Sequence, residues 1–188
     1  MSEHRKSRER EPAHVHGRFQ PFHREHLEYA AWAASNADEL VIGITNADPG
    51  HIRPEATDET RNDPKHNPFR YHERYRMIRN AVEASEIGCP VQIMPFPINR
   101  PELWEHYAPA DVVHYVNVLE AWHRVKVQRL REHGRSVVTK GGTRTVSGTD
   151  IRNRMASGGV WERDVPDEVV EVIDAIDGVP RVQKLFSE

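Results

Sequence analysis

Residues 13–26 read AHVHGRFQPFHREH, and this stretch decides the fold. Its first five residues have the length and character of a short strand, the glycine opens a loop, and the histidines lead into a helix predicted over residues 23–36. A strand that passes through a loop into a helix is the unit of an open α/β sheet, and ligands bind at that turn. We therefore predict that residues 17–26 lie at a binding edge.

Strands and helices alternate along the rest of the chain. Apolar runs predict strands at 40–44, 91–96, 112–116 and 136–139. Helices are expected from residue 72, over 119–133, from 147 to 158 and over 167–176, and Gly178 is expected to end the last one. This alternation predicts an α/β fold with a Rossmann-like, doubly wound parallel sheet and helices on both faces.

Two polar segments are set apart from this pattern. Residues 1–12 are charged and lack apolar periodicity, so we expect a disordered tail before a single domain over 13–188. Residues 45–70 contain four prolines and few apolar side chains. Such an insertion is typically functional or disordered, so a closing lid is one hypothesis and a solvated loop is the alternative.

The composition excludes several classes of protein. With 26 Lys and Arg against 29 Asp and Glu, a nucleic-acid binder is not indicated. A single cysteine, Cys89, rules out an internal disulfide framework and a Cys-rich zinc module. No apolar run approaches the roughly 20 residues of a membrane helix, and the first residues do not form a secretory signal. A cytoplasmic protein is expected.

The first chemical motif is the histidine pair that opens the first helix. His23 and His26 are three residues apart and share one face of its first turn. The free N–H groups and the dipole of a helix N-terminus favour phosphate, and nearby imidazoles stabilise charge on a transferring phosphoryl group. The alternatives are a surface pair of histidines or a metal site shared with Glu25.

The second motif is SGTDIRNRM, residues 147–155. Ser147 and Asp150 have the spacing of a capping box, and Arg152 follows within one helical turn. Hydroxyls, amides and a guanidinium at a helix start suit the oxygens of a polyphosphate. An ordinary capped surface helix is the alternative, but two such helix starts in one small α/β domain favour a phosphate site.

Together these segments resemble the nucleotidyltransferases that carry a His-x-Gly-His motif, over most of residues 13–186. Within that superfamily the pattern is similar to the archaeal-type nicotinamide mononucleotide adenylyltransferases. The matching segments are Gly17-Arg18-Phe19-Gln20-Pro21-Phe22-His23, Asn67-Pro68-Phe69 with Glu73-Arg74, Ile98-Asn99-Arg100 with Leu103-Trp104, and Ser147-Gly148-Thr149-Asp150-Ile151-Arg152.

The resemblance implies a reaction and a set of site residues. His23 and His26 would bind the nucleotide phosphates and the reacting centre, while Arg18 and Arg152 neutralise the triphosphate. The residues expected to bind the nucleotide are Gly17, Phe19, Gln20, Glu25, Asn117, Ser147, Gly148 and Thr149. An acceptor oxygen would attack the α-phosphorus and release pyrophosphate, with Mg²⁺ accompanying the nucleotide. No metal cage made of protein side chains alone is visible in the sequence.

The sequence departs from the adenylyltransferase pattern in the acceptor region. Glu25 replaces the motif glycine, and Pro101 replaces an asparagine that helps to define the nicotinamide pocket. The changed pocket, with the transfer motifs kept, resembles the cytidylyltransferases of phosphonate and phosphinate natural-product pathways. We expect Glu25 either to point away or to read a donor on the base or sugar.

The acceptor is then expected to be small and multiply charged, such as phosphonoformate, with CTP as the donor in antibiotic biosynthesis. Cationic groups and a ring would bind it, and the candidates are Arg61, Lys65, His66, Arg70, His72 and Trp104. For Trp104, a role in the core is the alternative. Adenylyl transfer from ATP to nicotinamide mononucleotide remains a second hypothesis, and a non-catalytic nucleotide-binding regulator a third. The partners expected are small molecules; relatives often assemble into oligomers, but the sequence does not fix the oligomeric state.

Overall fold

A computed structural model describes residues 10–48 and 63–187 of the chain. The predicted disordered tail falls outside the described residues except for its last three positions. Most of the polar insertion for which a lid is one hypothesis, residues 49–62, also lies outside them. Among residues 10–48 and 63–187, no helix has the length and apolar character needed to cross a membrane.

Five parallel strands form the sheet, in the order β3-β2-β1-β4-β5. The strands are β1 (Ala13–Gly17), β2 (Leu40–Ile44), β3 (Val91–Pro95), β4 (Val113–Val118) and β5 (Val137–Gly141). All five residues of β2 are buried, as its continuous apolar run predicts for a strand covered on both sides. The predicted doubly wound parallel sheet is confirmed.

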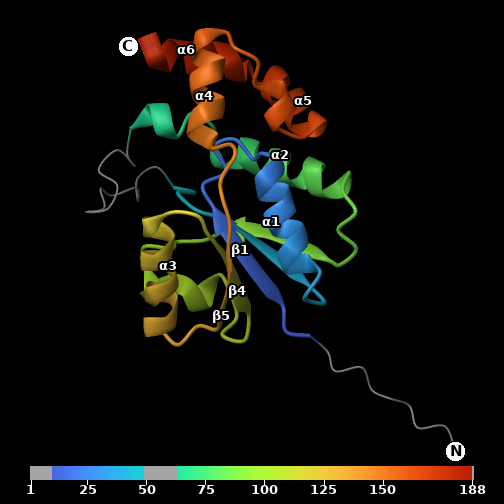
Figure 1. The fold of residues 1–188 in the computed structure, drawn as a ribbon, viewed down its shortest axis with the longest axis vertical. Helices are drawn as coiled ribbons and strands as arrows, with labels where there is room; N and C mark the ends of the chain where they lie inside the picture. Colours follow the sequence, from blue (N-terminus) through green and yellow to red (C-terminus); the bar gives the residue numbers. More distant parts are fainter. Residues whose placement is uncertain (1–9, 49–62, 188) are drawn as a thin grey trace, which may run out of the picture.

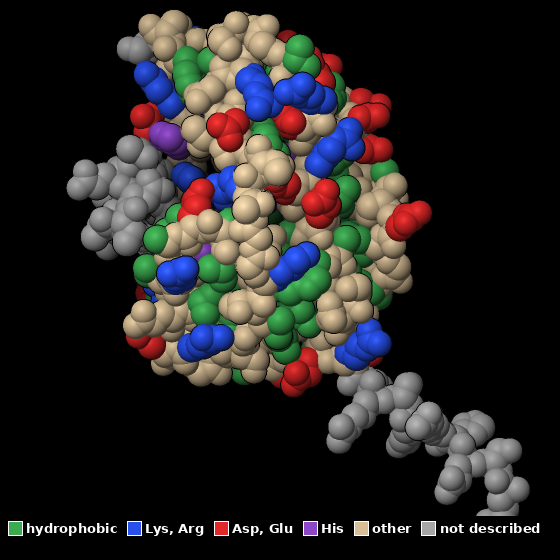
Figure 2. Space-filling view, in the orientation of Figure 1, with side chains coloured by type: hydrophobic (Ala, Val, Ile, Leu, Met, Phe, Trp, Pro, Cys, Tyr) green, Lys and Arg blue, Asp and Glu red, His purple; other side chains and the backbone are tan. Residues whose placement is uncertain are grey.

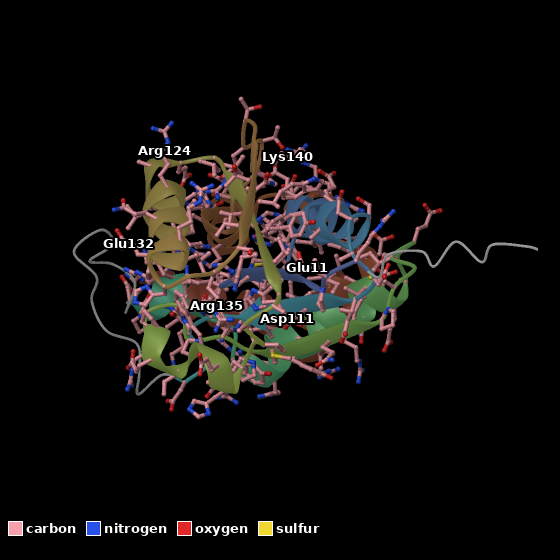
Figure 3. All side chains as sticks on the ribbon, turned by 90° about the horizontal axis from the view of Figure 1, so that it is seen from below. Glu11, Asp111, Arg124, Glu132, Arg135 and Lys140 are labelled. Carbon is pink, nitrogen blue, oxygen red and sulfur yellow. The ribbon has the colours of Figure 1, made fainter. Side chains whose placement is uncertain are left out.

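Helices cover both faces of this sheet (Figures 1 and 3). The helices are α1 (Arg24–Ala34), α2 (Tyr71–Glu83), α3 (Ala121–Glu132), α4 (Gly148–Ser157), α5 (Asp167–Ala175) and α6 (Gly178–Ser187), with short 3-10 turns η3 (Pro64–His66), η4 (Pro101–His106) and η5 (Glu162–Asp164). Helices α1 and α2 lie on one face, and η4 and α3 on the other (Figure 3). Helices α4, α5 and α6 pack together beyond the end of the sheet (Figure 1).

Two hydrophobic clusters fill the space between the sheet and its helices. The larger one contains Ala13 and Val15 of β1 together with α1, α2 and the C-terminal helices. The smaller one, which contains Phe96, Trp104 and Leu130, lies on the face covered by η4 and α3. Because side chains alternate along a strand, the two histidines of β1 are directed to the second face.

The structure corrects two details of the sequence prediction. Gly178 does not end the last helix but begins α6, a further helix that the sequence did not predict. A Cβ at Gly178 would lie 2.9 Å from Ile173 Cγ2 and 3.1 Å from Phe69 Cε1, so the glycine permits close packing at this turn. The sequence pattern of residues 23–36 also predicts Ala31 on the apolar face beside Ala30, but in α1 it is Ala30 and Ala33 that are buried, and Ala31 is exposed.

Acidic and basic side chains are interspersed over one face of the molecule, and no broad patch of one sign is seen there (Figure 2). The large hydrophobic side chains that are exposed among the described residues are Val125, Val138 and Val160, which are separate in the sequence. A concentration of basic side chains is found instead in the lining of a cavity.

Candidate active site

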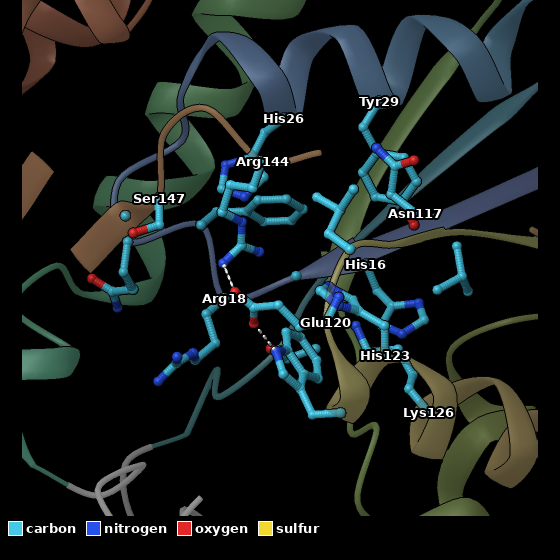
Figure 4. Close-up of a pocket in the computed structure, with 18 of the residues that line it drawn as sticks. His16, Arg18, His26, Tyr29, Asn117, Glu120, His123, Lys126, Arg144 and Ser147 are labelled. Atoms are coloured by element: carbon cyan, nitrogen blue, oxygen red, sulfur yellow. Dashed lines mark hydrogen bonds and ion pairs between the residues drawn. The ribbon is translucent and has the colours of Figure 1, made fainter. Parts of the chain in front are cut away.

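A cavity of about 530 Å³ opens where β1 and β4 end, and side chains from both strands line it. This volume is within the range of small-molecule sites. His16 and Gly17 of β1 line it together with Val116 and Asn117 of β4. Figure 4 shows His26, Arg144 and Ser147 on one side of the space and His16, His123 and Lys126 on the other.

The cavity exists because β1 and β4 separate. Their pairing is limited to Ala13 with Val113 and His14 with His114, whereas β1 pairs with β2 along its whole length. The chain winds outward in opposite directions from these two strands, which makes their boundary the topological switch point of the sheet. A ligand site is therefore expected at this place from the fold alone.

The loop after β1 is held in an unusual conformation by its neighbours. Phe19 has a positive φ of 52°, which is costly for a bulky residue and must be imposed by the surroundings. The Gln20 side chain donates to the carbonyl of Phe69 at 2.8 Å and accepts from its N–H at 2.9 Å. Arg74 donates to the carbonyls of Arg18 and Thr45 at 2.8 and 2.7 Å. These clamps fix the loop at the cavity wall.

The two motif histidines stack at the start of α1. The rings of His23 and His26 are 3.5 Å apart between centroids, and His23 is 3% exposed. His26 Nδ1 accepts the backbone N–H of His23 at 3.3 Å, so the proton of the neutral His26 ring lies on Nε2. Burial lowers the pKa of His23 to about 4 and holds the pKa of His26 well below its ordinary value. Both rings are therefore neutral at pH 7, and each carries one N–H that can donate to a ligand.

The second motif meets the first at the cavity. Arg152 Nη1 donates to the carbonyl of Gln20 at 2.6 Å, while its Nη2 contacts Thr149 Oγ1 at 3.0 Å and His66 Nδ1 at 3.1 Å. A Cβ at Gly148 would lie 2.8 Å from that same Gln20 oxygen. Only glycine lets the start of α4 approach the first loop so closely. Ser147 caps α4 by accepting from the N–H of Asp150 at 3.1 Å.

Glu25 joins the two motif loops. Its Oε1 accepts from the N–H of Thr145 at 2.8 Å, from Thr145 Oγ1 at 2.5 Å and from the N–H of Val146 at 3.2 Å. Burial raises the pKa of Glu25, but these hydrogen bonds outweigh that effect and lower its pKa below the ordinary value of 4.5. The carboxylate at the motif glycine position therefore ties the start of α1 to the segment before α4.

One wall of the cavity was missed by the sequence analysis. Glu120 accepts from Arg144 at 2.7 Å and from the indole N–H of Trp122 at 2.6 Å, and both contacts are drawn in Figure 4. The Nζ of Lys126 lies 4.6 Å from the centre of the Trp122 ring. His123 caps α3, since its Nδ1 accepts the N–H of Glu120 at 3.1 Å. A histidine at the third helical residue that accepts the N–H of the cap residue is thus common to α1 and α3.

The charges of the cavity suit a polyphosphate. Its lining includes five basic side chains and two carboxylates: Arg18, Lys126, Arg129, Arg144 and Arg152 against Glu25 and Glu120. Both carboxylates accept hydrogen bonds from other residues of the chain. Repulsion from Arg18 adds to burial in lowering the pKa of Arg152 to about 10, which leaves the guanidinium charged at pH 7. Such a site attracts multiply charged anions.

The structure brings most of the predicted site residues together. All twelve residues predicted as catalytic or nucleotide-binding line the cavity: Gly17, Arg18, Phe19, Gln20, His23, Glu25, His26, Asn117, Ser147, Gly148, Thr149 and Arg152. Of the cationic candidates in the insertion, His66 also lines it, whereas Arg61 lies outside the described residues.

Arg70, His72 and Trp104, which were also candidates for binding the acceptor, do not line the cavity, and neither does Lys65. Trp104 is 1% exposed, stacks against Phe96 and donates its indole N–H to the carbonyl of Pro97 at 3.0 Å, so it is a core residue. Arg70 and His72 lie at the start of α2 and are exposed. In that turn it is Glu73 that points inward, where it pairs with Arg181 at 2.6 Å. We therefore withdraw these three assignments.

Comparison with known proteins identifies the family of the chain. The cytidylyltransferase-like family profile matches residues 15–154. A phosphonoformate cytidylyltransferase of Streptomyces viridochromogenes is 40% identical over 162 residues, which covers 85% of this chain and 88% of that protein. A nicotinamide-nucleotide adenylyltransferase of Thermoplasma acidophilum is 34% identical over 185 residues, which covers 95% and 94% of the two chains.

The solved structures agree in fold. A bifunctional NMN adenylyltransferase/ADP ribose pyrophosphatase from Francisella tularensis, complexed with AMP and a manganese ion, superposes with a TM-score of 0.64 at 16% identity. The match covers 95% of this chain and 52% of that one, so this chain spans about half the length of the bifunctional enzyme. At this identity the likeness concerns the fold alone.

Proposed function

This chain belongs to the cytidylyltransferase-like family, and on that premise we propose that it joins the CMP part of CTP to a small phosphonate of the phosphonoformate type, with release of pyrophosphate. The observation that carries a nucleotidyl transfer is the meeting of two motifs at one cavity, where Arg152 contacts the first loop and His23 and His26 stack beside it. The choice of CTP and a phosphonate is supported by the 40% identity to the Streptomyces enzyme, against 34% for the Thermoplasma adenylyltransferase. A role in natural-product biosynthesis follows from that choice.

The proposed reaction is an in-line displacement at the α-phosphorus. An oxygen of the phosphonate forms a bond to this phosphorus, and the bond to the oxygen bridging to the β-phosphorus breaks. Pyrophosphate leaves with that electron pair. Because a phosphonate oxygen is already deprotonated near neutral pH, no general base is required. The neutral state of His23 and His26 fits this requirement, since their part is to donate hydrogen bonds.

Each side chain then has a defined task. His26 offers its Nε2–H to the developing charge, and Arg152 stabilises the phosphate oxygens from the fixed position that Gln20 gives it. Two basic side chains, Lys126 of α3 and Arg144, which pairs with Glu120, balance the charge of the pyrophosphate. The rate enhancement comes from positioning and from charge stabilisation, and no covalent intermediate is formed.

Magnesium enters this scheme as part of the metal–nucleotide substrate. Mg²⁺ prefers oxygen ligands and keeps its contacts with phosphates. The carboxylates of Glu25 and Glu120 are engaged by Thr145 and Arg144, and the buried Oδ1 of Asn117 has no hydrogen-bond partner among the described residues. This donor set fits an ion that is carried on the phosphates, with Asn117 as one available oxygen. When bound, the ion neutralises phosphate charge.

A second candidate is adenylyl transfer from ATP to nicotinamide mononucleotide. The adenylyltransferase of Thermoplasma acidophilum matches 95% of this chain, more than the cytidylyltransferase does. Its acceptor is also a phosphate-type oxygen, so the same side chains serve both reactions. The two candidates therefore differ in base and acceptor selection.

The test is a grid of pyrophosphate-release assays with magnesium present. CTP, ATP, GTP and UTP are each combined with phosphonoformate, other small phosphonates and nicotinamide mononucleotide. We expect the highest kcat/KM with CTP and a phosphonate. If ATP with nicotinamide mononucleotide is preferred, the second candidate is correct. Nucleotide binding by calorimetry without turnover for any pair would instead identify a regulator.

A further inference from the structure

Three histidines lie together on the sheet face that is covered by η4 and α3. His14 and His16 are two residues apart on β1 and so point to the same face. His114 of β4 is paired in register with His14. Among residues 10–48 and 63–187, these three form the group whose ligand atoms all lie within 4.8 Å of one another. The cluster lies where the pairing of β1 with β4 ends, at His14 and His114.

These imidazoles are buried without hydrogen-bond partners. His14 and His114 are 0% exposed and His16 is 2% exposed. Both ring nitrogens of all three side chains lack a hydrogen-bond partner within the described residues. A buried polar atom without a partner is costly, and native structures contain few of them. Six such nitrogens in one cluster therefore need an explanation.

Aromatic packing does not supply that explanation. The rings of His14 and His16 lie 4.4 and 5.2 Å from the ring of Phe96, and His114 lies 4.6 Å from His14. Apolar side chains would fill this space equally well and would leave no nitrogen unsatisfied. A cation that accepts lone pairs from several rings at once does explain the cluster.

We propose that His14, His16 and His114 bind a divalent transition-metal ion of the zinc type between β1 and β4, beneath the cavity. Three imidazoles without a carboxylate suit zinc, cobalt, nickel or copper and do not suit magnesium or calcium. Zinc-bound nitrogens lie about 2.0–2.1 Å from the ion, so modest rotations of the three rings close the site. Three protein ligands leave a fourth position for water.

The surroundings of His14 and His16 favour the neutral form of their rings. A histidine binds a metal in its neutral form. Burial holds the pKa of His14 and His16 well below the ordinary value, and neighbouring positive charges add to this effect. These charges are Lys126 and Arg135, and they oppose a bound cation as well. The Arg135 guanidinium donates to the carbonyl of Pro109 at 2.7 Å.

The cavity provides a route to the site. His16 lines it, so an ion can arrive through the same opening as the nucleotide. The proposal does not rest on the function proposed above, because metal binding is measured without substrate and turnover is not its readout.

The experiment uses the full chain without a polyhistidine tag, stripped of metal and loaded with Co²⁺ or Zn²⁺ in the absence of nucleotide. Equilibrium dialysis with elemental analysis is expected to give one ion per chain that an excess of Mg²⁺ does not displace. Bound Co²⁺ is expected to show visible d–d absorption. Removal of one imidazole ligand is expected to weaken binding by at least the 10- to 100-fold that loss of a supporting residue costs.

The variants are His14→Val and His114→Val, with His72→Ala as the matched control because His72 is exposed outside the cluster. Loss of metal in the valine variants alone supports the site. Equal binding by all variants overturns it, and so does loss of metal in His26→Asn with retention in the valine variants, which would place the ion in the cavity. If the valine variants do not fold, X-ray absorption of the zinc-loaded wild type decides. At least three imidazole nitrogens are expected on the ion, and fewer would refute the proposal.

Discussion

Replacing Glu25 with glutamine separates the structural link that this side chain makes from the reading of a base or sugar donor that the sequence left open for it. In the structure, its Oε1 accepts three hydrogen bonds from Thr145 and Val146 and joins α1 to the loop before α4. A hydrogen bond to a charged group contributes about 1.5–3 kcal/mol, and a neutral one about 1 kcal/mol. The three bonds share one oxygen on a partly exposed side chain. We therefore expect Glu25→Gln to cost about 2 kcal/mol of unfolding free energy.

The pH dependence of this loss has a definite sign. Because the pKa of Glu25 is lowered in the folded protein, its contribution is present above the ordinary value of 4.5 and is lost as the pH falls through the folded pKa. The difference between wild type and Glu25→Gln should be full at pH 7 and should vanish in acid. Urea denaturation at both pH values measures it. Glu28→Gln is the matched control, since Glu28 is exposed one turn later in the same helix.

Steady-state kinetics distinguish a structural role of Glu25, in which it links α1 to the loop before α4, from recognition of the nucleotide base. If Glu25 only positions the second motif, Glu25→Gln lowers kcat/KM for every nucleoside triphosphate by a similar factor. About tenfold is expected, equivalent to about 1.4 kcal/mol. A changed ratio of CTP to ATP use would show that Glu25 reads the base. A stability difference that does not depend on pH would refute the hydrogen-bonding argument.

Three further predictions concern the groups around Glu25. Arg152→Ala should lower kcat/KM by about 2–4 kcal/mol of transition-state stabilisation in steady-state assays, and an unchanged value would remove Arg152 from the site. Because burial lowers the pKa of His23 from 6.5 to about 4, folding stability should fall by about 3 kcal/mol as the pH drops through that interval. Denaturation of His23→Asn should show a smaller fall, and an identical profile would contradict the assignment. Gly148→Ala places a Cβ 2.8 Å from the Gln20 carbonyl, which should cost about 1–3 kcal/mol and most of the activity. Gly142→Ala, 3.5 Å from the nearest side-chain atom, should be nearly neutral in the same assays.

The sheet could be predicted because its signals are local. Continuous apolar runs such as 40–44 and the capping box at Ser147 identify elements without knowledge of the partners against which they pack. Helix α6 was missed for the opposite reason. Gly178 has the sequence signature of a helix end, and only its packing against Ile173 and Phe69 shows that the residue begins a helix.

The site was predictable where it follows the strand–loop–helix rule. The first loop and the start of α4 lie at strand ends, and their polar residues line the cavity as expected. Trp122 and Lys126 were missed because a cationic helix after β4 has the pattern of any surface helix. Trp104 was misassigned because the sequence does not show which face of η4 turns into the core. These errors concern long-range contacts.

The histidine caps of α1 and α3 have a consequence for the charge state of the protein. The Nδ1 of His26 accepts the N–H of His23, and that of His123 accepts the N–H of Glu120. A ring that is protonated on both nitrogens has no acceptor left for such a bond. An imidazolium and an intact helix start therefore exclude each other at these two positions. In acid, a proton competes with the backbone N–H for the Nδ1 lone pair of His26 and of His123. Acidification should therefore shorten both helices from their N-terminal ends.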